Sequence, residues 1–221
     1  MASFEQAREV LKRCFGHDEF RPEQEKAIRA IMGKRDVLAV MSTGAGKSLI
    51  YQVPAVALGG TAVALGGTAI VISPLVSLMI DQVKKLVELG LHPAFLNNTL
   101  SLRAQEKVRG RIKSGEFQIL YVAPERLSNP AFLSAIEGLA IPLVAVDEAH
   151  CISEWGHDFR GDYREISAFI ERFDQRPTVV ALTATATPKV RKDIARSLGL
   201  QNPLEIVSSF DRDNLSLSVV H

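Results

Sequence analysis

The stretch DVLAVMSTGAGKS, residues 36–48, indicates the fold more clearly than any other part of the chain. Residues 36–41 are mostly apolar and β-prone, as in a strand that is buried on both faces of a sheet. Residues 42–48 form a glycine-rich turn that ends in Gly-Lys-Ser and leads into a helical segment. A strand, such a turn and a helix, in this order, predict a phosphate-binding loop in which backbone N–H groups and a helix N-terminus surround phosphates.

The expected phosphate contacts come from this loop, and the flanking strand and helix argue against a chance glycine-rich turn. Lys47 would reach the β- and γ-phosphates, and the Ser48 hydroxyl would bind Mg²⁺. The main chain around the phosphates would belong to Thr43, Gly44, Ala45 and Gly46.

Further apolar runs alternate with amphipathic segments along the chain. The other strand-like runs are residues 68–73, 94–98, 118–123, 143–146 and 178–183. Segments with helical spacing and a glycine near the end are residues 77–90, 101–115 and 188–200. This alternation predicts an α/β domain with a mostly parallel sheet covered by helices on both faces.

Ligands of such sheets bind outside the carboxyl ends of the strands, so the residues that follow each apolar run matter most. Polar or turn-forming residues follow five of the runs, in the segments STGAGKS, SPLVS, APERL, DEAH and TATAT. The sequence therefore predicts one working surface at this edge of the sheet.

The DEAH segment supplies the expected catalytic carboxylates. Asp147 would hold Mg²⁺, and Glu148 would orient and deprotonate an attacking water. A lone Asp-Glu pair usually lies in a solvated loop, but the phosphate-binding loop upstream and the adjacent His150 weaken that interpretation.

Composition sets limits on the kind of protein. Of 221 residues, 47% are hydrophobic and 23% charged, as in ordinary globular domains. The net charge of +1 predicts no global basic field, so any nucleic acid would bind through a local surface. Two cysteines are too few for a disulfide framework or a four-cysteine zinc site. No apolar run approaches the roughly 18 residues of a membrane-spanning helix, and the charged N-terminus predicts no secretory signal, so an intracellular protein is expected.

One internal repeat interrupts the pattern, because AVALGGT occurs at 55–61 and again at 62–68. Seven residues are close to two helical turns, so a helix would nearly keep its buried face, whereas a strand would exchange its faces. We expect a tandem duplication that forms a longer helix end or a protruding loop without a catalytic role.

Together these motifs resemble RecQ-family DNA helicases of superfamily 2 over nearly the whole chain. The DEAH residues alone are shared with many RNA helicases, and the continuation CISEWGHDFR together with the upstream FRPEQ narrows the resemblance. The matching segments are FRPEQ at 20–24, the loop at 42–48, VISPLVSLMIDQV at 71–83, YVAPERL at 121–127, DEAHCISEWGHDFR at 147–160, ALTATAT at 181–187 and SSFDRDNL at 208–215.

The resemblance implies a RecA-like fold, ATP and Mg²⁺ as cofactors, and catalysis by Lys47, Asp147, Glu148 and His150. Arg21 and Gln24 would recognise adenine, because the Gln24 amide can hydrogen-bond the edge of the base. His17 would stack on the base, although its ring is smaller than the aromatic residue common in relatives.

The resemblance also implies an aromatic-rich loop that senses single-stranded DNA and couples this contact to hydrolysis. Rings can stack on bases and Arg160 can contact phosphate, with Trp155, His157 and Phe159 completing the loop. Two alternatives stay open: Trp155 and Phe159 pack in the core, or His150, Cys151 and His157 bind zinc. The zinc spacing fits no common structural site, so no structural zinc is expected.

Other positions follow from the same resemblance. Ser73, Pro74 and Arg126 would contact the DNA backbone, with a structural ion pair as the alternative for Arg126. Thr183 and Thr185 would link hydrolysis to DNA movement, or would satisfy strand-end backbone groups.

The resemblance finally suggests the organisation of a longer enzyme. Residues 1–210 would form a RecA-like ATP-binding domain, and residues 211–221 would begin the linker to a second RecA-like domain in cis. That domain would supply an arginine finger, which contributes about 10³ to 10⁵ in rate. The 221 residues alone are therefore expected to bind nucleotide and DNA weakly and to hydrolyse little ATP.

In the longer enzyme, the resemblance implies 3′ to 5′ movement on single-stranded DNA and unwinding of forked DNA in repair and recombination. The expected location is the cytoplasm or nucleoid of a bacterium or the nucleus of a eukaryote, with no membrane partner. Two other classes remain: a standalone ATP-dependent nucleic-acid-binding module without turnover, and a DEAH-type RNA helicase fragment that prefers RNA.

Overall fold

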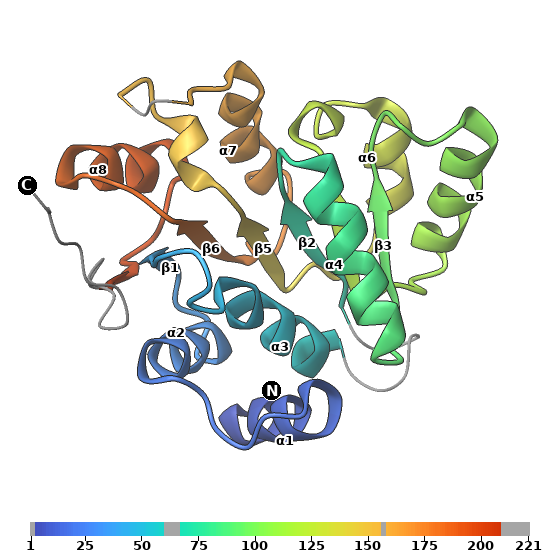
Figure 1. Cartoon of the computed structure of the whole chain (residues 1–221). Coiled ribbons are helices and arrows are strands. Elements are labelled where there is room, and N and C mark those ends of the chain that lie inside the picture. The colour runs from blue at the N-terminus through green and yellow to red at the C-terminus, as the bar shows by residue number, and fades with distance from the viewer. Residues whose placement is uncertain (1–2, 60–66, 156–157, 209–221) are drawn as a thin grey trace, which may run out of the picture.

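The computed structural model describes residues 3–59, 67–155 and 158–208. Within these ranges, seven strands form one parallel sheet in the order β3-β4-β2-β5-β6-β1-β7 (Figure 1). The strands are β1 Val37–Val40, β2 Ala69–Ile72, β3 Pro93–Leu96, β4 Ile119–Val122, β5 Leu143–Val146, β6 Thr178–Thr183 and β7 Leu204–Val207.

Helices cover both faces of this sheet. One face packs against α1 Phe4–Phe15, α2 Pro22–Met32, α3 Lys47–Gly59 and α4 Val76–Glu88. The other packs against α5 Leu102–Lys113, α6 Pro130–Ile136, α7 Glu165–Ile170 and α8 Pro188–Ser197. Three short 3₁₀ helices are η1 Pro124–Arg126, η2 Ala149–Ile152 and η3 Gly161–Arg164.

Side chains of the central strands alternate between the two apolar layers. In β2, Ile70 and Ile72 belong to the layer under α5 to α8, whereas Ala69 and Val71 belong to the layer under α1 to α4. All four are buried, because helices cover both faces. The α/β class with a parallel sheet covered on both faces, which the sequence predicts, is thus confirmed.

The six predicted strands are confirmed, and a seventh, β7, escaped the sequence analysis. Glu205 interrupts the apolar residues of Leu204–Val207, and only Ile206 is buried, so the segment differs from the continuous apolar runs of the inner strands. The strand lies at the edge of the described sheet, where β1 is its one paired neighbour among the described strands. Its pairing with β1 is a tertiary contact that local sequence does not encode.

The first AVALGGT copy contributes residues 55–59 to the end of α3, and the expectation for the duplication stays a prediction. Most of the second copy falls within residues 60–66, which lie outside the described residues, as does the predicted linker at 211–221.

At the amino ends of the strands, a buried carboxylate ties three segments together. Asp36, just before β1, accepts hydrogen bonds from both terminal nitrogens of Arg176 at 3.1 and 2.7 Å. It also accepts from the backbone N–H groups of Val179 at 2.8 Å and Gln201 at 2.7 Å. This network fixes the starts of β1 and β6 relative to the turn after α8.

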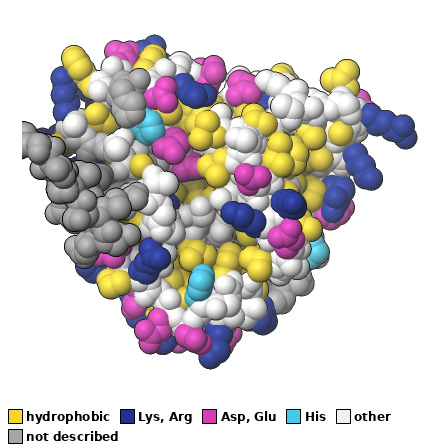
Figure 2. All heavy atoms as spheres, in the orientation of Figure 1, with side chains coloured by type: hydrophobic (Ala, Val, Ile, Leu, Met, Phe, Trp, Pro, Cys, Tyr) yellow, Lys and Arg dark blue, Asp and Glu magenta, His cyan; other side chains and the backbone are white. Residues whose placement is uncertain are grey.

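The surface carries no single-sign field on the face shown in Figure 2, where Lys and Arg side chains are interspersed with Asp and Glu. This mixture agrees with the net charge of +1. None of the helices in the described ranges has the length and apolar character needed to cross a bilayer.

Candidate active site

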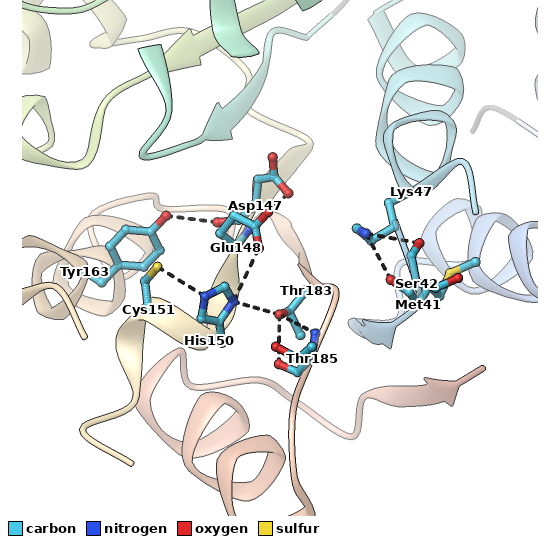
Figure 3. A network of polar contacts seen from close by, with 10 residues as sticks. All are labelled: Met41, Ser42, Lys47, Asp147, Glu148, His150, Cys151, Tyr163, Thr183 and Thr185. Carbon is cyan, nitrogen blue, oxygen red and sulfur yellow. Dashed lines mark hydrogen bonds and ion pairs between the residues drawn. The ribbon is translucent and has the colours of Figure 1, made fainter. Parts of the chain in front are cut away.

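The glycine-rich loop joins β1 to α3, as the sequence predicts. Gly44 and Gly46 have φ values of 84° and 78°, a backbone conformation that favours glycine. The Lys47 ammonium donates to the carbonyl of Met41 at 2.9 Å and to that of Ser42 at 3.4 Å (Figure 3). These neutral acceptors are weaker than phosphate oxygens, so the same ammonium can turn toward an anionic ligand.

Two residues at the start of α2, Arg21 and Gln24, hydrogen-bond to the glycine-rich loop, and both are expected to recognise adenine. The Gln24 amide nitrogen donates to the carbonyls of Ala45 at 3.3 Å and Gly46 at 3.1 Å, and its oxygen accepts from the Arg21 N–H at 3.0 Å. A guanidinium nitrogen of Arg21 donates to the Gly44 carbonyl at 3.2 Å. A Cβ on Gly46 would lie 2.3 Å from the Gln24 amide nitrogen, so glycine is required for this approach.

The adenine-reading role of these residues stays a prediction. His17 is exposed in the turn after α1, next to Gly16 with its φ of 70°. Base recognition by Gln24 would use the amide that now donates to the phosphate-binding loop. Adenine binding would therefore change the hydrogen bonds that hold this loop.

Asp147 follows β5, and its backbone N–H donates to the carbonyl of Ile72 in β2 at 2.8 Å. Burial raises the pKa of its carboxyl group to about 6, and the charge of Glu148 adds to the rise. The Glu148 N–H, which donates to Asp147 Oδ1 at 3.0 Å, and the charge of Lys47 act in the opposite direction. Burial and the two adjacent carboxylates outweigh the charge of Lys47, an environment in which Asp147 and the Ser48 hydroxyl could hold a divalent cation.

Glu148 has a left-handed backbone, with φ 48° and ψ 45°. This conformation costs a residue other than glycine about 1–2 kcal/mol, and such costs concentrate at functional sites. Its carboxylate Oε2 lies 3.3 Å from His150 Nδ1. The turn into η2 thus brings the carboxylate and the imidazole of the DEAH segment together.

His150 extends this contact to the next strand. Its Nδ1 is 2.8 Å from the Thr183 hydroxyl, which donates to the carbonyl of Thr185 at 3.1 Å (Figure 3). Because the Thr183 hydrogen is used on that carbonyl and Glu148 can only accept, we assign the proton of the imidazole to Nδ1.

Hydrogen bonds within the TATAT segment confirm one of its two interpretations, the satisfaction of strand-end backbone groups. The buried Thr183 hydroxyl also accepts from the Thr185 N–H at 3.3 Å, so it satisfies strand-end backbone groups. At the same time it connects the β6 end to His150. The coupling role of Thr183 and Thr185 stays a prediction.

Tyr163 belongs to this site, and the sequence analysis missed it. Its buried hydroxyl donates to the carbonyl of Asp147 at 2.9 Å. Burial raises the pKa of the Tyr163 phenol, so the group remains a donor at neutral pH. A tyrosine in a polar segment after DEAH carries no local signal of this contact.

Cys151 lies beside the imidazole, with its Sγ 3.8 Å from His150 Nε2. The ligand atoms of His150, Cys151 and Asp158 all lie within 4.8 Å of one another, whereas His157 lies outside the described residues. Burial raises the pKa of the Cys151 thiol to about 11. Since His150 also contacts Glu148 and Thr183, we attribute the cluster to the hydrolytic site.

Trp155 and Phe159 lie at the surface, so the alternative that they pack in the core is wrong. Trp155 is 64% exposed and Phe159 is 39% exposed. The Lys189 ammonium lies 3.0 Å from the Trp155 ring centroid, and the Arg164 guanidinium lies 5.1 Å from that of Phe159. Arg160 is exposed, and its backbone N–H donates to the Cys151 carbonyl at 2.9 Å, which anchors the segment to η2.

The expected DNA-backbone residues lie at the ends of β2 and β4. Ser73 is buried and its hydroxyl lacks a hydrogen-bond partner in the described structure, while Pro74 is half-buried. Arg126 donates to the carbonyl of Asn97 at 3.2 Å, and no carboxylate in the described ranges forms an ion pair with it. Asn97, which the sequence analysis missed, has a buried amide nitrogen that is also unpaired. Contacts of these residues with DNA stay predictions.

The fold and the site define a nucleotide-binding domain of the P-loop class, with a phosphate-binding loop and an Asp-Glu pair at the same edge of a parallel sheet. The chain belongs to the DEAD/DEAH box helicase family, which it matches over residues 21–194.

Within this family, the chain is similar to RecQ helicases. The chain is 42% identical to the ATP-dependent DNA helicase RecQ of Bacillus subtilis, over 97% of this chain and 35% of that protein. It is 42% identical to the RecQ-like DNA helicase blm-1 of Caenorhabditis elegans, over 96% of this chain and 22% of that protein. The RecQ resemblance is thus confirmed, and the chain spans only 22 to 35% of the length of these two relatives.

A solved structure supports the fold. The crystal structure of the Pyrococcus furiosus Hef helicase domain aligns with a TM-score of 0.66 at 21% identity, covering 88% of this chain and 39% of that one. At this identity the likeness concerns the RecA-like fold alone.

Proposed function

We propose that this chain is the ATP-binding motor domain of a RecQ-like 3′ to 5′ DNA helicase, which couples ATP hydrolysis to movement on single-stranded DNA and to unwinding. The observation that carries the proposal is one short segment that joins the catalytic carboxylate to an exposed ring. The Cys151 N–H donates to the Glu148 carbonyl at 2.9 Å, and the Trp155 N–H donates to the Ser153 hydroxyl at 3.2 Å. A base that moves Trp155 would therefore act on Glu148 through few intermediaries.

Each residue of the site has a role in this proposal. Lys47 would leave its carbonyl partners for the β- and γ-phosphates. Ser48 and Asp147 would hold Mg²⁺, which when bound with ATP neutralises charge on the phosphate oxygens. Glu148 would take the proton of the attacking water, and His150 would keep that carboxylate oriented through the contact at 3.3 Å.

The proposal includes a second RecA-like domain in cis, because this chain covers 35% of the B. subtilis relative. An arginine finger from that domain contributes about 10³ to 10⁵ in rate, so the present chain alone would turn over slowly. The proposed partners of the longer enzyme are single-stranded and forked DNA, in repair and recombination.

Steady-state ATP hydrolysis with and without single-stranded DNA tests the proposal. Slow turnover that DNA stimulates and that Glu148→Gln abolishes is the expected result. Trp155→Ala should remove the stimulation while sparing ATP binding, and Trp155→Phe, which keeps a ring, should retain part of it. Stimulation that survives in Trp155→Ala would contradict the proposed coupling.

Competition between single-stranded DNA and RNA of the same sequence separates this proposal from an RNA helicase. The RecQ relatives are named as DNA helicases, so DNA is the expected preferred competitor. Nucleotide-linked DNA affinity without any turnover, even after the second domain is added, would instead favour a binding module.

A further inference from the structure

The pair formed by Trp155 and Lys189 is not explained by the helicase motifs. Trp155 belongs to the segment after DEAH, and Lys189 lies in the first turn of α8, after the TATAT segment. The Lys189 ammonium lies 3.0 Å from the centroid of the indole, so it covers one face of the ring. Both side chains are exposed, so neither is held there by burial.

We propose that Lys189 is a nucleic-acid-binding residue that also positions the Trp155 ring. Without nucleic acid, the ammonium occupies the indole face. When a base stacks on Trp155, the ammonium leaves the ring and binds a backbone phosphate of the same strand. This inference rests on the proposed function, because it assumes a single-stranded ligand at Trp155.

The relative strengths of the interactions allow this exchange. A cation over an exposed ring is a weak contact, whereas stacking of a base on an aromatic side chain is typically stronger. The displaced ammonium gains a phosphate, which is a charged partner in place of a ring quadrupole. The exchange therefore favours the nucleic-acid-bound arrangement at both groups.

The charge of Lys189 is available for a phosphate. Two other cations of α8 are committed to carboxylates, Arg191 to Glu205 at 3.7 Å and Arg196 to Asp193 at 2.5 Å. Over the described part of the chain, no carboxylate lies within 4.0 Å of the Lys189 ammonium.

The contact between Trp155 and Lys189 also links two segments of the fold. The DEAH segment already contacts the end of β6 through His150 and Thr183 at 2.8 Å. The Trp155 contact with Lys189 joins the same two segments again, nearer the surface. A base on Trp155 would release the contact with Lys189 and leave the contact between His150 and Thr183. Trp155 could then move while His150 stays in place.

The fluorescence of this chain gives a direct test, because Trp155 is its single tryptophan. Lys189→Met removes the ammonium and keeps the length of the side chain. Lys192→Met, one turn further along α8 at an exposed position, is the matched control. Circular dichroism would verify that both variants keep the wild-type fold.

Without nucleic acid, we expect Lys189→Met to change the Trp155 emission maximum and to increase its quenching by acrylamide, while Lys192→Met resembles wild type. Titration with a labelled oligothymidylate at several salt concentrations should then show weaker binding by Lys189→Met. The slope of log affinity against log salt should fall by about 0.7, the value for one phosphate contact on a single strand.

Emission of Lys189→Met that matches the control overturns the positioning role, and an unchanged salt slope overturns the phosphate contact. Either result rejects the inference while leaving the proposed function intact. If wild type itself neither binds the oligonucleotide nor changes its Trp155 emission on addition, the proposed function fails, whatever the variants do.

Discussion

Asp36 and Asp147 are two buried carboxylates at opposite ends of one sheet, with 2% and 9% of their surface exposed. Asp36 precedes β1 and accepts four hydrogen bonds, two of them from Arg176. Asp147 follows β5, and within the described ranges its carboxylate accepts one hydrogen bond, from the Glu148 N–H. Burial and the charge of Glu148 raise its pKa to about 6.

The difference shows what separates a structural from a functional buried charge. A buried carboxylate is tolerated when a cation and N–H donors compensate the loss of water, as they do at Asp36. Asp147 lacks this compensation and lies beside a second carboxylate. Burial of Asp147 therefore destabilises the folded chain, and a bound cation would offset this cost.

The largest expected effect comes from neutralising the compensated carboxylate. Asp36→Asn would leave Arg176 without its buried partner and replace one acceptor with a donor. Removing one member of such a pair costs about 3–5 kcal/mol, so the midpoint of urea denaturation should fall sharply. A loss below about 1 kcal/mol would contradict the structural role of Asp36.

The corresponding substitution at Asp147 should raise the free energy of unfolding rather than lower it. The folded pKa of about 6 exceeds the ordinary value of 3.8, so this carboxyl group lowers the free energy of unfolding as pH rises from about 4 to about 6. Asp147→Asn should therefore stabilise the metal-free chain by about 3 kcal/mol at most above pH 6 and by nothing near pH 4. Urea denaturation at both pH values checks this, and equal differences would contradict it.

A smaller effect is expected at the inner contact between the DEAH segment and β6. Thr183→Val keeps the shape of the buried side chain and removes the hydroxyl that contacts His150 at 2.8 Å. The expected loss is about 1 kcal/mol in unfolding free energy, with nucleotide affinity unchanged. Thr183→Ser keeps the hydroxyl and is the control, so identical stability of the two variants would show that the hydrogen bonds contribute nothing.

The smallest effect is expected from the repeat, whose described residues 55–59 form the end of α3. Deleting residues 62–68 removes the second AVALGGT copy and should leave the affinity for a fluorescent ATP analogue unchanged. A tenfold loss of affinity would show that the second copy contributes to nucleotide binding.

The sequence predicts those parts of the molecule whose signal is local. Each inner strand is a short apolar run because both of its faces are buried, and the loop from Thr43 to Ser48 needs glycine for its backbone shape. In the edge strand β7, Glu205 interrupts the apolar run, and only Ile206 is buried. Tyr163 and Lys189 act on residues distant in sequence, and no local pattern marks such contacts.

Residues 36–48 and the carboxylates of DEAH therefore determined, from sequence alone, that the chain forms a parallel α/β domain with a phosphate-binding loop. Backbone conformation and apolar periodicity are properties of neighbouring residues, which a sequence states directly. Only the tertiary structure decided which buried aspartate is compensated, which nitrogen of His150 carries the proton, and which cation covers Trp155. Those outcomes depend on distances between segments far apart in the chain, and packing alone sets them.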